Sequence, residues 1–130
     1  MVDTVFRKMA DAHPRQSAGE EARRDAEFHL AIIEASHNVV LLHMMRSMYE
    51  LLREGVFYNR QVMFRQRTTR VTLLDQHRAI NVALQARAAE GARAAAHAHL
   101  DFVAAALRDQ RTAEAHEAIA RKRLEHEDKR

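Results

Sequence analysis

Asp25 and His29 stand four residues apart in a segment rich in helix-forming residues. On a helix this spacing places both side chains on one face, one turn apart. A carboxylate and an imidazole placed in this way can bind one metal ion together. The same spacing also arises by chance in a helix with many charged residues, so an ordinary solvent-exposed polar pair remains the alternative interpretation.

His77 and His99 each interrupt an apolar helical stripe. The apolar neighbours are Leu73, Leu74, Ile80 and Leu84 around His77, and Ala95, Ala96, Phe102, Val103 and Ala106 around His99. A buried neutral imidazole needs hydrogen-bond partners. Either each is a core histidine satisfied locally, or both join Asp25 and His29 in one metal site inside a helical bundle. Three imidazoles and one carboxylate suit Zn²⁺, Ni²⁺, Cu²⁺, Fe²⁺ or Mn²⁺, and the sequence does not select among these divalent transition metals.

Other chemistries find less support in the sequence. The remaining histidines are expected at the surface or at helix ends: His13, His37, His43, His97, His116 and His126. Glu34 and His37 form an ExxH pattern typical of di-iron bundles, but such sites need a second copy, which is missing. The absence of cysteine excludes disulfides and thiolate ligands. There is no nucleophile triad, P-loop or Gly-rich dinucleotide turn.

The composition predicts that these residues lie on helices. The chain has 130 residues, of which 47% are hydrophobic, and only three Gly and one Pro. This scarcity of turn residues favours long helices, so we expect a single all-α domain over 1–130, an antiparallel bundle of about five to six helices. With no membrane-spanning run and no signal peptide, the expected location is the cytoplasm. Positive and negative charges alternate, and the net charge is +3, which is typical of a solvated surface rather than a DNA-binding patch.

The helices expected from periodicity and punctuation cover most of the chain. Their ranges are Val2–Ala12, 20–36, from 38 onward, 71–90, 92–109 and 113–127, and the third helix either ends at Gly55 or is kinked there and continues through Phe57 and Tyr58. Ser17 and Asn38 are the expected N-caps, and Gly55 and Gly91 are expected to kink or break helices. The third helix carries the apolar stripe Leu41, Leu42, Met45, Met48, Tyr49 and Leu52.

Three motifs together resemble the FCD domain, the effector domain of the FadR branch of GntR-type transcription regulators. The segment DAEFHLAIIEASHNVVL, from Asp25 to Leu41, resembles the family signature. QHRAI, beginning at Gln76, resembles the family's E/Q-H-x-x-I helix, and AHL around His99 resembles its closing H-L motif. The motifs occur in the family's order, and the resemblance covers about residues 20–108.

The resemblance implies an antiparallel helical bundle in which Asp25, His29, His77 and His99 bind one divalent metal ion. It further implies a small carboxylate effector bound beside or on the metal, and the stretch ASHNVVLLH looks most like that of pyruvate-, lactate- and glycolate-responsive regulators. A homodimer is expected, with DNA bound only through a winged-helix domain that this sequence does not contain. The usual first helix of the domain is also expected to be missing.

We expect a sensor in which cationic and amide side chains hold the rest of the effector, since Arg binds carboxylates well. The candidate effector-binding residues are Arg46, Arg53, Asn59, Arg60, Arg70 and Asn81. One alternative is a metal-dependent hydrolase or isomerase, for which Glu27 and Glu34 are the nearest carboxylates in sequence. The other is a structural helical dimerisation module that the metal only stabilises.

Overall fold

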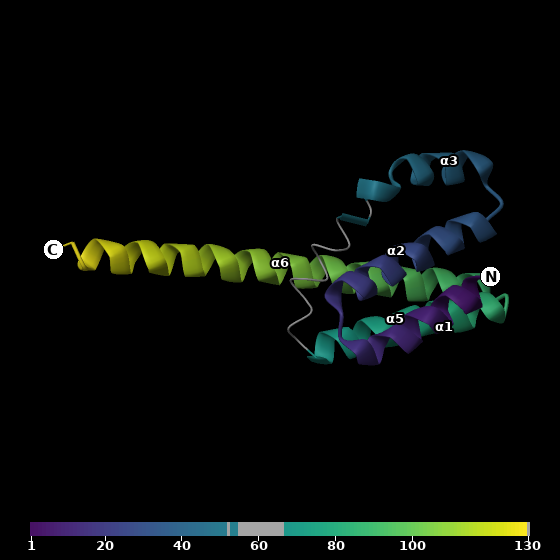
Figure 1. Ribbon diagram of the computed structural model, residues 1–130, viewed down its shortest axis with the longest axis horizontal. Coiled ribbons are helices and arrows are strands. Elements are labelled where there is room, and N and C mark those ends of the chain that lie inside the picture. The colour runs from purple at the N-terminus through teal and green to yellow at the C-terminus, as the bar shows by residue number, and fades with distance from the viewer. Residues whose placement is uncertain (52, 55–66, 130) are drawn as a thin grey trace. The chain divides into compact units, whose positions relative to one another are not determined.

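The computed structural model describes residues 1–51, 53–54 and 67–129, and these form helices without any strand. The helices are α1 (Val2–Ala12), the short 3-10 helix η1 (His13–Arg15), α2 (Ala18–Ala35), α3 (Val39–Ser47), α5 (Arg67–Gln85) and α6 (Ala89–Glu127) (Figure 1). Two compact units are present, Met1–His99 and Leu100–Arg130, so that α6 begins in the first unit and continues as the second. The predicted all-α helical fold is confirmed.

Local side-chain chemistry explains where α2 and α3 begin. The Ser17 hydroxyl accepts a hydrogen bond from the Glu20 amide at 3.3 Å, and the Asn38 side-chain oxygen accepts one from the Leu41 amide at 3.0 Å. Each oxygen satisfies an amide that has no partner within the first turn of its helix. Both predicted N-caps are therefore confirmed.

The break between α5 and α6 lies earlier than predicted. The chain leaves α5 at Gln85, Arg87 adopts a left-handed φ of 54°, and α6 starts at Ala89. Gly91, which was expected to mark the break, is the third residue of α6. Glycine costs a helix only about 1 kcal/mol relative to alanine, so good helix formers on both sides override it.

The predicted division of the C-terminal region into helices 92–109 and 113–127 was also wrong, because α6 is continuous through Ala89–Glu127. No Gly or Pro lies between the two predicted segments to end the first of them. Residues 111–129 are exposed throughout, and Arg121 pairs with Glu117 at 3.4 Å. The solvated surface expected from the alternating charges is found along this part of α6.

Gly91→Ala is expected to stabilise the protein by about 0.5–1 kcal/mol, because alanine loses less backbone entropy on entering a helix. An added Cβ would lie 3.5 Å from the Ala88 Cβ and 3.7 Å from the Ala83 Cβ, which is ordinary van der Waals contact. Urea unfolding measures the change, with the exposed Ala94→Gly as the opposite substitution on the same helix. A Gly91→Ala variant less stable than wild type would mean that the start of α6 needs glycine.

The hydrophobic core lies where α1, α2 and α5 meet, and α1 packs against both other helices (Figure 1). Its buried members are Val2, Phe6, Met9, Phe28, Ala31 and Ile80. The Phe6 and Phe28 rings meet edge to face at 6.1 Å between centroids, a favourable aromatic geometry. Ala95 and Ala96 of α6 pack against the same cluster, so the core fixes the helices that carry Asp25, His29, His77 and His99.

Helix α3 contributes little to this core. It has no buried residue, and Leu41 and Met48 of the predicted apolar stripe are exposed, while Leu42, Met45 and Tyr49 are half-buried. Leu52 and Gly55 lie outside the described residues. Across the described part of the chain, no helix combines the length and the apolarity that crossing a membrane requires.

Candidate metal centre

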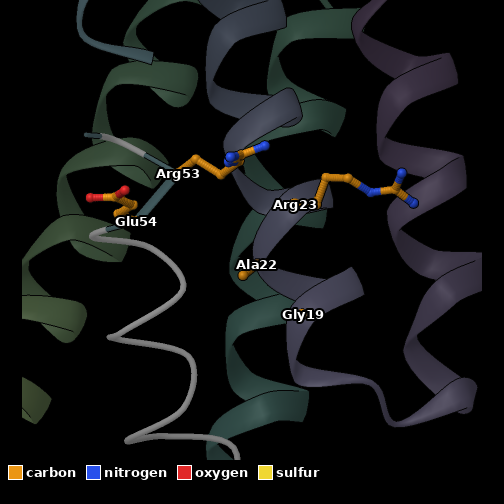
Figure 2. Close-up of a pocket in the computed structure, with 5 residues that line it drawn as sticks. All are labelled: Gly19, Ala22, Arg23, Arg53 and Glu54. Atoms are coloured by element: carbon orange, nitrogen blue, oxygen red, sulfur yellow. The ribbon is translucent and has the colours of Figure 1, made fainter. Parts of the chain in front are cut away.

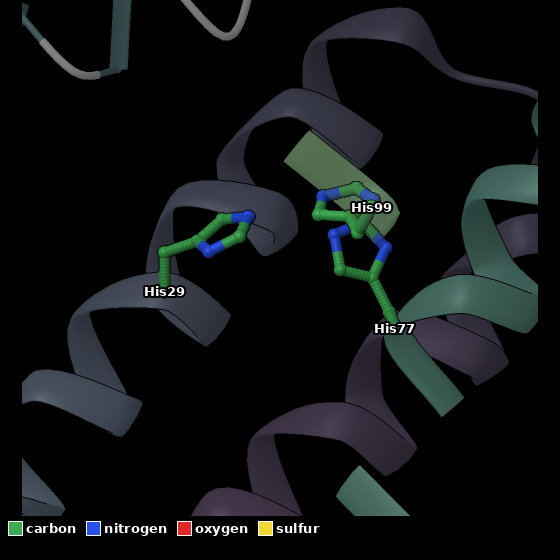
Figure 3. Close-up of side chains that lie close together, drawn as sticks. All are labelled: His29, His77 and His99. Carbon is green, nitrogen blue, oxygen red and sulfur yellow. The ribbon is translucent and has the colours of Figure 1, made fainter. Parts of the chain in front are cut away.

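Three histidines from three helices converge in the first compact unit. His29 lies on α2, His77 on α5 and His99 on the first part of α6. Figure 3 shows the three rings turned toward one another. One nitrogen from each imidazole lies within 4.8 Å of the corresponding nitrogens of the other two. Residues far apart in the sequence therefore present three metal-ligating atoms to one point.

Asp25 adjoins this cluster from α2. Its Oδ1 lies 3.0 Å from His29 Nε2 and 3.5 Å from His77 Nε2. The contact with His29 follows from the i, i+4 spacing, which places both side chains on the same helix face. The contact with His77 comes from the packing of α5 against that face. The structure thus brings together the residues that the sequence singled out, in the form of three histidines with the carboxylate beside two of them.

The cluster lies mostly inside the protein. His77 is 0% exposed and His99 is 3% exposed, whereas His29 is half-buried. The Phe28 ring packs edge-on against His77 at 5.3 Å between centroids. The centroids of His77 and His99 lie 4.3 Å apart, and the His29 and His99 rings stack at 5.6 Å with an interplanar angle of 17°. An apolar wall beside ligand atoms limits the access of water and strengthens electrostatic interactions in the site.

The donor set fits a divalent transition metal. Nitrogen and oxygen ligands bind Zn²⁺ at about 2.0–2.2 Å, so neighbouring ligand atoms of a tetrahedral site are roughly 3.4 Å apart. The distances from Asp25 Oδ1 to the two histidine nitrogens, 3.0 and 3.5 Å, bracket this spacing. Three imidazoles and a carboxylate gathered in a largely buried place bring nitrogen and oxygen atoms close enough together to share one ion. An ion bound by Asp25, His29, His77 and His99 would use all four groups.

Gln76 contacts the cluster from α5. Its Oε1 lies 2.8 Å from His99 Nδ1. Gln76 lies in a segment that resembles a family motif, but its contact was not predicted, because nothing in the local pattern pairs position 76 with position 99.

Two of the predicted effector-binding arginines lie at the surface beside α2. Arg46 pairs with Glu34 at 3.0 Å, and Arg53 pairs with Glu50 at 2.7 Å. Arg53 also lines a hollow of about 320 Å³ together with Gly19, Ala22, Arg23 and Glu54 (Figure 2). Ala22 precedes Asp25 by about one turn of α2, so this hollow opens on α2 one turn from Asp25.

The other predicted effector-binding residues have different surroundings. Arg70 is buried and its guanidinium donates to Glu21 and to the His13 carbonyl. Asn81 is buried too, and its amide donates to Asp3 at 2.9 Å and accepts from Gln85 at 3.3 Å. Asn59 and Arg60 lie outside the described residues. Effector binding by all six residues stays a prediction.

The ion pair between Arg70 and Glu21 was not anticipated from the sequence. Arg70 Nε donates to both Glu21 carboxylate oxygens, at 3.1 and 3.3 Å, and Nη2 approaches the same carboxylate. His13 Nδ1 lies 3.7 Å from Glu21 Oε1. These contacts join α5, α2 and η1. No local pattern reveals them, because the partners are far apart in the chain.

The remaining carboxylates considered for an enzyme are engaged elsewhere. Glu27 pairs with Arg24 at 2.9 Å, and Glu34 pairs with Arg46. Because Glu27 and Glu34 each contact an arginine, the geometry does not support either carboxylate as a general base at the histidine cluster.

Comparison with known proteins gives related regulators. The chain is 45% identical over 82 residues to a putative L-lactate dehydrogenase operon regulatory protein of Escherichia coli (strain K12), covering 63% of this chain and 32% of that protein. The protein of the same name from Shigella flexneri matches to the same extent. The HTH-type transcriptional regulator LutR of Bacillus subtilis (strain 168) is 32% identical over 103 residues, covering 78% of this chain and 46% of LutR. The chain therefore spans about a third to a half of the length of these relatives.

Residues 1–102 match the FCD domain family, a range that includes Asp25, His29, His77 and His99. The relatives are transcription regulators rather than enzymes, in agreement with the resemblance seen in the motifs. The chain belongs to the FCD domain family, whose members are regulatory domains of GntR-type transcription regulators.

Proposed function

We propose that this chain is the ligand-sensing part of a GntR-type regulator and that it binds a small 2-hydroxy or 2-oxo carboxylate at a divalent metal site. The observation that carries the proposal is the convergence of His29, His77 and His99 from three helices, with Asp25 beside them. Side chains that serve packing alone are usually apolar, because burying an imidazole costs free energy unless its nitrogens have partners.

The charges of the residues favour an anionic ligand. Three neutral imidazoles and one carboxylate carry a single negative charge, so a divalent ion held by them would supply a net positive charge that attracts a carboxylate. Phe28 and the packed helices keep the surroundings of His77 dry, which strengthens that attraction.

The surface beside α2 offers a place for the rest of the effector. The hollow lined by Ala22, Arg23 and Arg53 is about 320 Å³, within the range of small-ligand sites. Arg53 could hold a second polar group of the effector through its guanidinium. Of the ligand class proposed, L-lactate is the first to test, since two of the relatives are named for an L-lactate dehydrogenase operon.

Binding at this place would couple to the rest of a longer protein. The ligands come from α2, α5 and α6, so an effector that alters their spacing would change the relative positions of these helices. In the longer protein that we propose, a homodimer reads out this change through winged-helix domains on DNA.

We expect L-lactate to raise the melting temperature of the metal-loaded protein by several degrees at a concentration about a hundredfold above its Kd. The same addition should have little effect after EDTA treatment, and propionate, which lacks the 2-hydroxyl group, should act more weakly. Arg53→Gln should reduce the response, whereas Arg93→Gln, an exposed arginine on α6, should not. A protein that is stabilised by metal but by none of lactate, pyruvate, glycolate or citrate would favour the structural module instead.

A further inference from the structure

Gln76 and His99 are joined by a short contact between two helices. Gln76 Oε1 lies 2.8 Å from His99 Nδ1, and Gln76 is half-buried on α5 while His99 is buried on α6. A carboxamide oxygen only accepts hydrogen bonds, so this contact requires a proton on Nδ1. The lone pair of a neutral His99 then lies on Nε2.

With the proton on Nδ1, the His99 ring has its lone pair on Nε2, where it could bind a metal ion. Figure 3 shows the His99 ring turned toward His29 and His77. A metal-binding histidine usually donates its other ring N–H to an acceptor that fixes the tautomer and the ring orientation. We propose that Gln76 is a positioning residue that holds His99 with its Nε2 lone pair directed at the metal centre. This inference rests on the proposed metal site.

Gln76 also affects the net charge of the metal site, because its side chain is uncharged. A glutamate could accept the same hydrogen bond, but it would add a negative charge beside His99. Asp25 is the one carboxylate that contacts the histidines of the cluster among the ion pairs described. With glutamine at position 76, a divalent ion in the site retains a net positive charge for an anionic ligand. Glutamine at position 76 thereby favours the binding of an anionic ligand, whereas glutamate would favour a higher affinity for the metal.

Two substitutions separate these roles. Gln76→Leu removes the acceptor, and we expect Zn²⁺ affinity to fall by about 10–100-fold, the usual effect of losing an outer partner of a metal ligand. Gln76→Glu keeps the acceptor, so Zn²⁺ affinity should equal or exceed that of wild type. The added charge should weaken L-lactate binding to the Co²⁺-loaded protein by about tenfold. Gln110→Leu and Gln110→Glu on α6, where the wild-type side chain donates to Glu114, serve as matched controls.

Two of the measured quantities would not change if Gln76 only stabilised the fold: the tautomer of His99 and the Co²⁺ absorption spectrum. Imidazole ¹⁵N NMR of the metal-free protein reports the His99 tautomer, which should be Nδ1–H in wild type and Gln76→Glu and mixed in Gln76→Leu. Chelator competition gives the Zn²⁺ affinity, and the Co²⁺ absorption spectrum should change in Gln76→Leu and be restored in Gln76→Glu.

The possible outcomes distinguish this inference from the proposed function. Wild-type Zn²⁺ affinity and an unchanged tautomer in Gln76→Leu would overturn the role of Gln76 while leaving the metal site in place. Unaltered L-lactate binding in Gln76→Glu would overturn the part that concerns charge. A wild-type protein that binds neither Zn²⁺ nor Co²⁺ would overturn the proposed function itself, whatever the tautomer of His99.

Discussion

His99→Ala is expected to lower the affinity for Zn²⁺ by more than about a hundredfold. Loss of an outer hydrogen-bond partner of a ligand already costs about 10–100-fold, and this substitution removes one of the three converging imidazoles themselves. The position is also 3% exposed, so a water molecule from bulk solvent cannot simply replace the lost nitrogen. Chelator competition and metal analysis by mass spectrometry measure the change.

The neighbouring His97 provides a matched control. It lies two positions earlier on α6, which places it on nearly the opposite face of the helix, and it is exposed, so His97→Ala removes an imidazole from the same helix but from its solvent face. We expect its Zn²⁺ affinity to stay within about twofold of wild type. Equal affinities in both variants would refute a metal site at His99. Circular dichroism of the metal-free proteins checks that His99→Ala still folds. His29→Ala repeats the measurement of Zn²⁺ affinity at a half-buried position, where the substitution leaves a smaller cavity.

Glu21→Ala is expected to destabilise the protein by about 3–5 kcal/mol. The side chains of Glu21 and Arg70 are 6% and 7% exposed, so removal of the acid takes away a buried carboxylate that accepts hydrogen bonds from the Arg70 guanidinium. The His13 carbonyl, 2.9 Å from Arg70 Nη2, cannot neutralise that charge. Urea unfolding at constant pH, on protein free of metal, gives the change in the free energy of unfolding.

A double-mutant cycle isolates the pairing. Arg70→Met with Glu21→Ala together should cost less than the sum of the two single substitutions, because no unpaired charge remains. The exposed pair Arg46–Glu34 is the control, and Glu34→Ala should cost no more than about 1 kcal/mol. A Glu21→Ala variant within 1 kcal/mol of wild type would show that water reaches Arg70.

The features that sequence alone predicted depend on spacing within one element. The helix Val2–Ala12 was predicted with the bounds that the structure has, and Ser17 and Asn38 cap helices as expected. In the apolar stripe around His77, Leu73 and Ile80 are buried and Leu74 and Leu84 are half-buried, because these residues recur at the helical period. Family motifs added that Asp25, His29, His77 and His99 meet, since helical periodicity cannot show which faces of different helices pack together.

The features that were missed are of two kinds. One depends on a weak helix breaker competing with strong helix formers, and the other on contacts between residues far apart in the sequence. Gly91 is a weak helix breaker, and the strong helix formers around it decide the start of α6. The pairing of Glu21 with Arg70 and that of Gln76 with His99 arise only once α5 is packed against its neighbours. Many charged residues could have made such contacts, and sequence spacing ranks none of them above another.

The three histidines are 48 and 22 positions apart along the chain, in a protein that has no cysteine. An ion held by them would act as a reversible crosslink that closes two loops at once. Closing loops of this kind lowers the entropy of the unfolded chain, as a disulfide does, but the link depends on free metal concentration rather than on redox conditions. The folded population of such a domain would rise and fall with the supply of metal. When metal is scarce, the domain would therefore unfold even while its effector is still present.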